Sequence, residues 1–278
     1  MLNFNGKFIP ESDPKINNRG LLFGDGVFET VKVLDGKVLF LEDHYFRLMS
    51  SMRIVRMEIP MEFTMEFLEK QILDTANEVG YLDSARVRMT VFRKGQGYYL
   101  PQTNDVDWIL SATALENKVY SISEGKYEVE LFKDFYVTKQ LLSTIKSTNK
   151  LVNITGSVFA DENGYENCLL MNDSKNVIEA LNANLFIVVG NKISTPPISE
   201  GCLNGVMRKQ ILALARKNEN WEVSEEVISP FDLQKADELF LTNVISGIRP
   251  ISQYRKKSYT QKVSEELLIR LNAQIRLA

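Results

Sequence analysis

The feature that most constrains the fold of this chain is a polar, lysine-bearing stretch that leads to a carboxylate at a strand end. Lys146 begins this stretch, and the helix after it is predicted to end at the break Asn163-Gly164-Tyr165. The apolar run Cys168-Leu169-Leu170-Met171 then precedes a strand that ends at Glu179, before an Asn-rich break. Functional groups gather at such loops. A lysine amine attacks carbonyls and a carboxylate holds a nearby cation, so the pair suits imine chemistry, although a solvated ion pair fits the same pattern.

Composition and charge narrow the class of protein. A length of 278 residues is enough for two modest domains, and 44% hydrophobic with 25% charged residues is ordinary for a globular protein. The net charge of −3 and the scattered basic residues give no indication of a nucleic-acid partner. We see no signal peptide and no apolar run of membrane-spanning length, so we expect no membrane partner. Cys168 and Cys202 lie in apolar contexts, which favours a reduced, cytoplasmic location over a disulfide framework.

The single histidine, His44, limits the chemistry further. A His-dependent triad or a multi-histidine metal site would have to rest on this residue alone, so we expect no metal site. Its neighbours Glu42, Asp43 and Tyr45 mark a predicted helix start, and we therefore expect the His44 side chain to face solvent. Acid–base work then needs another group, such as a lysine whose pKa is lowered.

Turn and periodicity signals divide the first half of the chain. Asn5-Gly6 and Asp35-Gly36 each predict a two-residue hairpin. Gly24-Asp25-Gly26 is read as a tight turn, because it lacks the third glycine and the lysine of a phosphate loop. The remaining predicted elements of this half are a helix from Leu41, a helix over Met61–Val79, and strands over 85–93 and 108–115.

The second half begins after the polar stretch Glu116–Glu124, which is read as an interdomain linker. The predicted elements beyond it are a strand over 127–136, a strand pair (185–189 and 192–194) around Gly190-Asn191, a helix over 206–217 with Asn204 as N-cap, a short helix near 231–235 and a terminal helix over 260–275. The start of the helix at Val206 presents free N–H groups and a positive dipole end, which suit a phosphate. Any helix start shares this property, so the signal is generic.

Together these stretches resemble the class IV aminotransferases, pyridoxal-phosphate enzymes of fold type IV that include branched-chain and D-amino-acid aminotransferases and aminodeoxychorismate lyase. The resemblance covers nearly the whole chain and rests on Gly24–Glu29, His44–Leu48, Lys146–Leu151, Asn204–Arg208 and Leu241–Asn243. It implies a two-domain fold of the α+β or α/β class and a homodimer whose pocket borrows a loop from the neighbouring subunit. The implied division is an N-terminal α/β domain (1–117), a linker (118–124) and a C-terminal pseudo-barrel α/β domain (125–278) carrying the lysine.

The resemblance also implies roles for individual residues. Lys146 would form an imine with pyridoxal 5'-phosphate and then move the substrate α-proton, and the spacing Lys146-x-x-Asn149 favours it over Lys150. Glu179 would keep the pyridine nitrogen protonated, so that the ring accepts electrons. Arg47 would bind the phosphate through its planar fork of donors, although a surface arginine fits the same local pattern.

The remaining implied contacts involve the helix start, a second turn and the first-domain strands. The implied cofactor contacts are Leu203, on the face of the ring, and a group of residues at the phosphate: Gly205, Val206, Met207, Asn243 and Val244. Aminotransferases of the family often carry threonine where Met207 and Val244 stand, so backbone N–H groups and Asn243 are expected to hold the phosphate here. The implied substrate contacts are Phe28, Arg88 and Arg93. A core position for Phe28 and an exposed edge for the arginines are the alternatives.

The reaction itself stays open between two members of the family. We favour transfer of an amino group between an amino acid, branched-chain or D, and a 2-oxo acid. The alternative is a 4-amino-4-deoxychorismate lyase that releases 4-aminobenzoate and pyruvate, which the stretches at 146–151, 204–208 and 241–243 resemble more. The glycine- and arginine-rich loop typical of the lyases is only partly present, at Lys94–Tyr98. A non-catalytic member of the family that binds an acidic ligand through Arg86, Arg88 and Arg93 is a further alternative. It would need neither Lys146 nor Glu179, so the presence of both residues favours an enzyme.

Overall fold

The computed structural model describes residues 1–9, 18–122 and 125–277 and is of the mixed α/β class that the sequence predicts. Its contacts divide the chain into two compact units, which are described separately. Unit 1 comprises Met1–Lys118 and Ile145–Asn149, and unit 2 comprises Val119–Thr144 and Lys150–Ala278. The lysine segment Ile145–Asn149, which we expected within the C-terminal domain, thus packs with the N-terminal unit.

Unit 1 is built on a six-stranded antiparallel sheet in the order β2-β1-β6-β5-β3-β4. The strands are β1 (Leu2–Phe4), β2 (Lys7–Ile9), β3 (Gly26–Leu34), β4 (Lys37–Val38), β5 (Ser84–Arg93) and β6 (Val106–Ala114). The hairpins predicted around Asn5-Gly6 and Asp35-Gly36 are confirmed, and all of these turn residues have positive φ. Asparagine, aspartate and glycine tolerate that conformation best, which is why these dipeptides are reliable turn signals.

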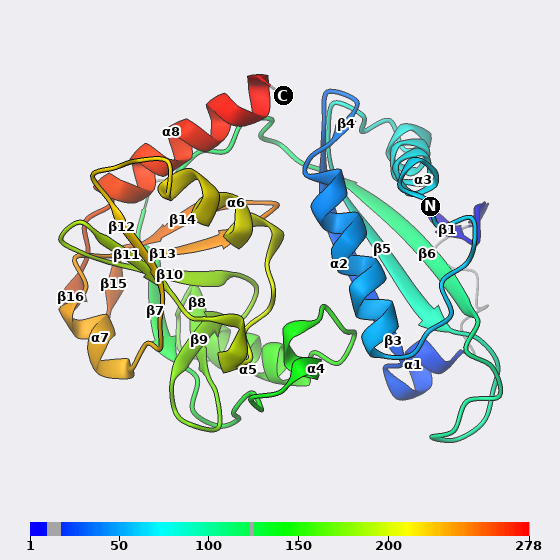
Figure 1. Cartoon of the computed structure of the whole chain (residues 1–278), viewed down its shortest axis with the longest axis horizontal. Coiled ribbons are helices and arrows are strands. Elements are labelled where there is room, and N and C mark those ends of the chain that lie inside the picture. Colours follow the sequence, from blue (N-terminus) through cyan, green and yellow to red (C-terminus); the bar gives the residue numbers. More distant parts are fainter. Residues whose placement is uncertain (10–17, 123–124, 278) are drawn as a thin grey trace. The chain divides into compact units, whose positions relative to one another are not determined.

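Three helices accompany this sheet: α1 (Arg19–Phe23), α2 (Leu41–Ile54) and α3 (Met65–Glu78). α2 and α3 pack against β3, β5 and β6 (Figure 1), and their buried faces form a core with Val31, Leu48 and Leu110. α3 begins later than the predicted Met61, because the Thr64 hydroxyl accepts a hydrogen bond from the Phe67 N–H and caps the helix there. α1 was not predicted; it precedes the turn at 24–26.

Unit 2 contains a ten-stranded sheet whose main path is β12-β11-β10-β9-β8-β7-β15-β16; off this path, β13 pairs with β10 and β14 pairs with β13. The strands are β7 (Glu128–Leu131), β8 (Asn167–Met171), β9 (Val177–Ala180), β10 (Asn184–Val189), β11 (Lys192–Thr195), β12 (Glu222–Glu225), β13 (Glu238–Asn243), β14 (Gly247–Ile251), β15 (Gln253–Tyr254) and β16 (Lys257–Ser258). One cross-strand row includes the predicted cofactor residue Glu179: Glu179 on β9 pairs with Asn184 on β10, which pairs with Thr242 on β13.

The helices of unit 2 are α4 (Leu141–Thr144), α5 (Leu151–Glu162), α6 (Val206–Ala215), α7 (Pro230–Lys235) and α8 (Lys262–Leu277), with a 3-10 turn, η1 (Ile198–Glu200). α6 and α8 pack against each other, and α8 also contacts β13 and β14 (Figure 1). The predicted N-cap of α6, Asn204, is wrong by one position, since Gly205 occupies the cap. Among the described residues, none of the helices is long and apolar enough to cross a membrane.

Candidate active site

Lys146 is held in unit 1 against the beginning of β3. Its backbone carbonyl accepts a hydrogen bond of 2.8 Å from the Phe28 N–H, and Ser147 forms an antiparallel bridge with Val27. The Lys146 Nζ lies 4.5 Å from the centroid of the Phe28 ring. The structure therefore brings together the predicted catalytic lysine and a predicted substrate contact, and the ring face attracts the ammonium form.

Arg88 on β5 shares the same aromatic ring. Its guanidinium carbon lies 3.8 Å from the Phe28 centroid, and its Nε donates to the Thr90 hydroxyl at 3.2 Å. Burial, with the charge of Arg86 beside it, lowers the pKa of Arg88. No carboxylate forms a salt bridge with Arg88 anywhere in the described parts of the chain. A half-buried guanidinium with donors to spare is suited to binding an anionic ligand group.

Arg93, the other strand arginine proposed for substrate, is engaged differently. It is buried, and its Nε donates to Asp25 Oδ2 at 3.0 Å. Its remaining nitrogens donate to the carbonyls of Val55 and Arg56 and to the Asn104 side chain. Because these donors already have protein acceptors, the contacts argue for a structural role, and Arg88 is the better candidate for the substrate carboxylate.

A buried ionic cluster joins β3 to α2. Arg47 donates from Nε and from one terminal nitrogen to the two Glu29 oxygens, at 2.7 Å and 2.5 Å. His44 Nδ1 lies 2.7 Å from Glu29 Oε2. The expectation that His44 faces solvent is wrong: its side chain is buried, because Glu29, distant in sequence, supplies a partner that local sequence does not reveal.

The cluster sets the charge state of its members. Burial alone would raise the pKa of Glu29, but the charge and hydrogen bonds of Arg47, with the His44 hydrogen bond, outweigh it and lower that pKa to about 2. The pKa of His44 is lowered mainly by burial, with help from the charges of Arg47 and Lys146 and against its bond to Glu29. Glu29 is therefore an anion at neutral pH, and it orients Arg47, the predicted phosphate ligand.

In unit 2 the predicted cofactor residues gather around the cross-strand row of β9 and β10. Glu179 is buried, and its Oε2 accepts a hydrogen bond of 2.9 Å from the Leu203 N–H. Asn184 donates from Nδ2 to the Leu203 carbonyl at 2.8 Å. Glu179 and Asn184, which pair across the two strands, thus bind the N–H and the carbonyl of Leu203 and fix its backbone. Burial and then the negative charge of Glu179 raise the pKa of the neighbouring Cys202 to about 12.

The start of α6 has the features of an anion site. Gly205 occupies the N-cap without a capping side chain, as far as the described residues show, so first-turn N–H groups are available as donors. Val206 and Met207 have buried side chains, so their contribution to a ligand is through the backbone. A Cβ on Gly205 would lie 1.9 Å from Asn184 Oδ1, so only glycine allows this close approach. This donor set fits a phosphate.

The second predicted phosphate turn lies beside the same row, after β13. The side-chain oxygen of Asn243, Oδ1, accepts hydrogen bonds from the backbone N–H groups of Ile245 and Ser246, at 2.9 and 2.8 Å. Asn243 therefore shapes the turn with that oxygen. The Tyr120 hydroxyl donates to the Val244 carbonyl, and burial raises the pKa of Tyr120, which keeps it a neutral donor.

Sequence reasoning missed several of these supports. Glu29 is the last residue of the stretch Gly24–Glu29, so a signal for it was present. Asn184 stands in the Asn-rich break after Glu179, which was singled out only as a break. Tyr120 lies in the predicted linker, where nothing local indicates its contact with Val244, more than a hundred residues further along the chain.

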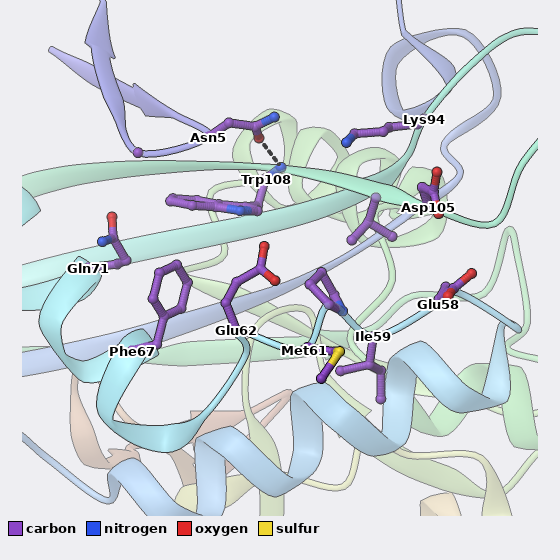
Figure 2. Close-up of a pocket in the computed structure, with 13 residues that line it drawn as sticks. Asn5, Glu58, Ile59, Met61, Glu62, Phe67, Gln71, Lys94, Asp105 and Trp108 are labelled. Atoms are coloured by element: carbon purple, nitrogen blue, oxygen red, sulfur yellow. Dashed lines mark hydrogen bonds between the residues drawn. The ribbon is translucent and has the colours of Figure 1, made fainter.

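A cavity of about 440 Å³ in unit 1 lies apart from these residues. Figure 2 shows it between α3, the loop before that helix, and β6, with Trp108 and Phe67 among its lining side chains. Glu58, Glu62 and Asp105 also line it, whereas none of the predicted catalytic, cofactor or substrate residues does. It is therefore not the site that the sequence motifs define.

Comparison with known proteins identifies the class of this enzyme. The profile of the amino-transferase class IV family matches residues 26–254, which is most of the chain, and the chain therefore belongs to that family. The predicted family and enzyme class, aminotransferase, are confirmed.

Individual relatives agree with this assignment. A protein of Methanocaldococcus jannaschii, provisionally named a branched-chain-amino-acid aminotransferase, is 30% identical over 98% of this chain and 94% of its own length. The D-alanine aminotransferase of Staphylococcus aureus (strain N315) is 26% identical over 89% of this chain and 86% of its own. The crystal structure of the branched-chain aminotransferase of Thermobaculum terrenum in its PLP form is 22% identical, with a TM-score of 0.84 over 99% of this chain and 92% of that one. The predicted fold is thereby confirmed.

Proposed function

We propose that this aminotransferase uses pyridoxal 5'-phosphate to move an amino group from a branched-chain amino acid to a 2-oxo acid. The observation that carries the proposal is that Lys146 and Arg88 both contact the Phe28 ring, with the amine 4.5 Å and the guanidinium carbon 3.8 Å from its centroid. The relative with 30% identity over nearly the whole chain bears a branched-chain name, and a similar structure holds PLP. D-Alanine, the substrate named for the staphylococcal relative, is the second candidate amino donor.

Lys146 has two tasks in this proposal. Its Nζ would hold the cofactor, and the same amine would move the proton of the substrate α-carbon. When bound, the cofactor withdraws electrons from that carbon. Glu179 supplies the negative partner for the pyridine nitrogen, and its bond from the Leu203 N–H holds the carboxylate in place for that task.

The phosphate is assigned to backbone and guanidinium donors. The N–H groups of Gly205, Val206 and Met207 lie at a helix start that lacks a side-chain cap in the described structure, where the helix dipole favours an anion. Arg47 adds charge, and its bidentate bond to Glu29 limits the rotamers it adopts. The threonines frequent in the family at positions 207 and 244 are replaced by Met207 and Val244, so backbone groups take a larger share.

The substrate carboxylate is assigned to Arg88. Stacking on Phe28 orients the guanidinium plane, and the bond to Thr90 uses one donor only. Because an uncompensated, half-buried cation is costly, a bound carboxylate relieves that cost and gains charge-assisted hydrogen bonds. We therefore expect an amino acid to react more slowly when its carboxylate is converted to an amide.

Lyase activity on aminodeoxychorismate is the competing function. Both reactions begin with loss of the α-proton to the same lysine, so Lys146 and Glu179 serve either reaction equally well. What favours transamination is the names of the relatives and the incomplete glycine- and arginine-rich loop at Lys94–Tyr98.

A coupled substrate panel tests the proposal. Purified protein loaded with pyridoxal phosphate would be offered L-leucine, L-glutamate or D-alanine with 2-oxoglutarate or pyruvate, and separately aminodeoxychorismate. We expect keto acid from L-leucine with 2-oxoglutarate. Keto acid formed from D-alanine and from no other amino acid would show that D-alanine, the second candidate, is the amino donor. Release of 4-aminobenzoate and pyruvate without amino transfer would overturn transamination in favour of the lyase.

We also propose that the protein acts as a homodimer. Unit 1 exposes the apolar side chains of Leu21 and Leu22 on α1, and Tyr98 and Tyr99 in the loop after β5 are 88% and 94% exposed. Large apolar side chains left exposed in this way are typical of protein interfaces. Light scattering of the purified protein should give twice the mass of the chain, and a monomer mass would overturn the proposal.

The two cysteines support a reducing, cytoplasmic location. Cys168 and Cys202 are both free and buried. Thiols that stay unpaired inside the protein are usual where glutathione keeps cysteines reduced. Fractionation of cells that express the tagged protein tests this assignment, and recovery from the medium would contradict it.

A further inference from the structure

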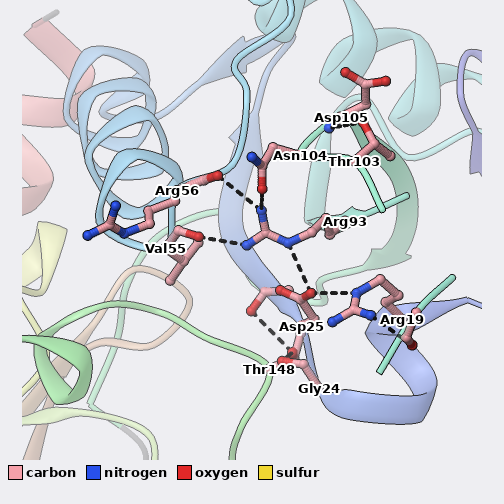
Figure 3. Close-up of polar contacts among 12 residues, drawn as sticks. Arg19, Gly24, Asp25, Val55, Arg56, Arg93, Thr103, Asn104, Asp105 and Thr148 are labelled. Atoms are coloured by element: carbon pink, nitrogen blue, oxygen red, sulfur yellow. Dashed lines mark hydrogen bonds and ion pairs between the residues drawn. The ribbon is translucent and has the colours of Figure 1, made fainter. Parts of the chain in front are cut away.

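The turn Gly24–Gly26 lies at the centre of a buried charge network that the proposed mechanism does not use. Figure 3 shows the Asp25 carboxylate between two arginines: its Oδ2 accepts from Arg19 Nε at 2.9 Å and from Arg93 Nε at 3.0 Å. Both arginines are buried, with 4% and 6% of their surface exposed. One carboxylate therefore compensates two guanidinium groups that would be costly to bury alone.

The two arginines tie the turn to distant parts of unit 1. Arg19 donates to the carbonyls of Gly97 and Tyr98 at 3.2 and 2.7 Å, and thus to the loop after β5. The Arg93 backbone N–H donates to the Asp25 carbonyl at 3.1 Å, in addition to the side-chain pair. Through its other nitrogens Arg93 reaches the end of α2 and the loop before β6. Asp25 is thereby fixed from several directions.

The carbonyls of the same turn hold the lysine segment. The Thr148 hydroxyl donates to the Gly24 carbonyl at 2.8 Å. The Gly26 carbonyl accepts a hydrogen bond of 2.9 Å from the Thr148 N–H, and it lies 3.1 Å from the Thr148 hydroxyl. Asn149 Nδ2 donates to the Gly24 carbonyl at 2.9 Å. Together with the bond from the Phe28 N–H to the Lys146 carbonyl, these contacts fasten the segment from Lys146 to Asn149 to the turn and to the start of β3.

The glycines on either side of Asp25 permit this close contact. Gly24 has φ of +62°, and a Cβ there would lie 2.7 Å from Asn149 Oδ1. A Cβ on Gly26 would lie 3.1 Å from the Val91 carbonyl and 3.2 Å from Thr148. Glycine at positions 24 and 26 thus lets Thr148 and Asn149 come close to the turn, and Asp25 between the two glycines binds the arginines that hold the turn in place.

We propose that Asp25 is a positioning residue for the lysine segment: its carboxylate, shared by Arg19 and Arg93, fixes the turn that holds Thr148 and Asn149. Asp25 touches neither the lysine side chain nor the reacting atoms, and it acts through the carbonyls of its neighbouring glycines. The effect on catalysis rests on the function proposed for Lys146, whereas the effect on the segment does not.

Amide hydrogen exchange of the cofactor-free protein tests the effect on the segment directly. The variants are Asp25→Asn, which keeps the shape but removes the charge, and Thr148→Val, a milder change that removes only the hydroxyl bonds. Asp83→Asn is the control, because Asp83 is an exposed carboxylate of the same unit. We expect exchange at the Thr148 amide to rise at least about tenfold in both variants and not in the control, while amides of β10 in unit 2 stay unchanged. The double variant should exchange no faster than the faster single variant, since both changes release the same turn.

Turnover of the loaded enzyme gives the second readout. Asp25→Asn should lower kcat about tenfold or more while KM changes less than about threefold, because the lysine is misplaced and the substrate site is not. An unchanged Thr148 amide in Asp25→Asn would overturn the proposal. An equal rise in exchange rate at every amide of unit 1 would also overturn it, because that result means general destabilisation. A double variant in which the two increases in the Thr148 exchange rate multiply would overturn it as well. A loosened segment with unchanged turnover would instead contradict the role given to Lys146.

Discussion

Removing the Glu29 charge should destabilise unit 1 by an amount that the structure allows us to estimate. Arg47 and His44 lower the pKa of Glu29 from 4.5 to about 2. At about 1.4 kcal/mol for each tenfold change in proton affinity, the ionised carboxylate contributes about 3 kcal/mol to folding at neutral pH. Glu29→Gln loses that contribution and leaves the Arg47 charge buried without its anion, so we expect a loss of about 3 kcal/mol in the free energy of unfolding.

Urea unfolding followed by tryptophan fluorescence measures this loss. Trp108 lies in unit 1, where its ring is buried beside Phe67, and a Trp221→Phe background leaves it as the sole reporter. Asp74→Asn is the matched control, because Asp74 forms an exposed pair with Lys70, worth at most about 0.5 kcal/mol. A loss below about 1 kcal/mol in Glu29→Gln would refute the reasoning.

The pH dependence gives an independent check on the same residue. Because the folded pKa of Glu29 lies below its unfolded value of 4.5, the stabilisation is complete above pH 4.5 and is lost as the pH falls towards about 2. The stability difference between the native protein and Glu29→Gln should therefore shrink over that window. A difference that stays constant from pH 6 to pH 3 would contradict the assigned ionisation.

Three further predictions concern unit 2. Gly205→Ala should weaken pyridoxal-phosphate binding at least about tenfold in an absorbance titration, because its Cβ would collide with Asn184 Oδ1, and an unchanged affinity would argue against a phosphate at this helix start. Glu179→Gln should slow loss of the substrate α-proton by about 10²-fold in stopped-flow with α-deuterated substrate, with little change in cofactor affinity; unchanged turnover would remove Glu179 from the mechanism. Cys202, whose pKa is raised to about 12, should resist iodoacetamide at pH 8 in the folded protein, and rapid alkylation would contradict its burial beside Glu179.

Local signals were sufficient for much of the fold. The hairpins followed from dipeptides that tolerate positive φ, and α5 ends at Glu162, directly before the break predicted at Asn163. Helix limits were less certain where capping decides them, as at Thr64 and Gly205. A capping bond depends on the backbone angles of the cap residue, which the sequence pattern does not fix.

The site was harder to predict wherever a partner is distant in sequence. His44 has charged neighbours along the chain, which indicate exposure, yet Glu29 from β3 meets it in a buried cluster. Arg93 shares its strand with Arg88, but Asp25 and Asn104 occupy its donors. Such contacts depend on the sheet register and on the packing of α2, and neither can be predicted from the hydrophobic periodicity of a single sequence.

The placement of the lysine segment follows the same principle. Ile145 is buried in the core of unit 1, and the bonds of Thr148 to Gly24 and Gly26 fasten the segment there. Along the chain it is flanked by α4 and α5 of unit 2, so sequence order alone assigned it to the later domain. Strand pairing between segments more than a hundred residues apart decided otherwise.

The most direct test of the account is to find which lysine carries the cofactor. Protein loaded with pyridoxal phosphate would be reduced with borohydride, digested and sequenced by tandem mass spectrometry, with Lys150 as the internal comparison. We expect the phosphopyridoxyl group on Lys146, its loss in Lys146→Ala and its retention in Lys150→Met. A label on Lys150, or uniform low labelling of surface lysines, would contradict the central claim that Lys146 is the catalytic residue.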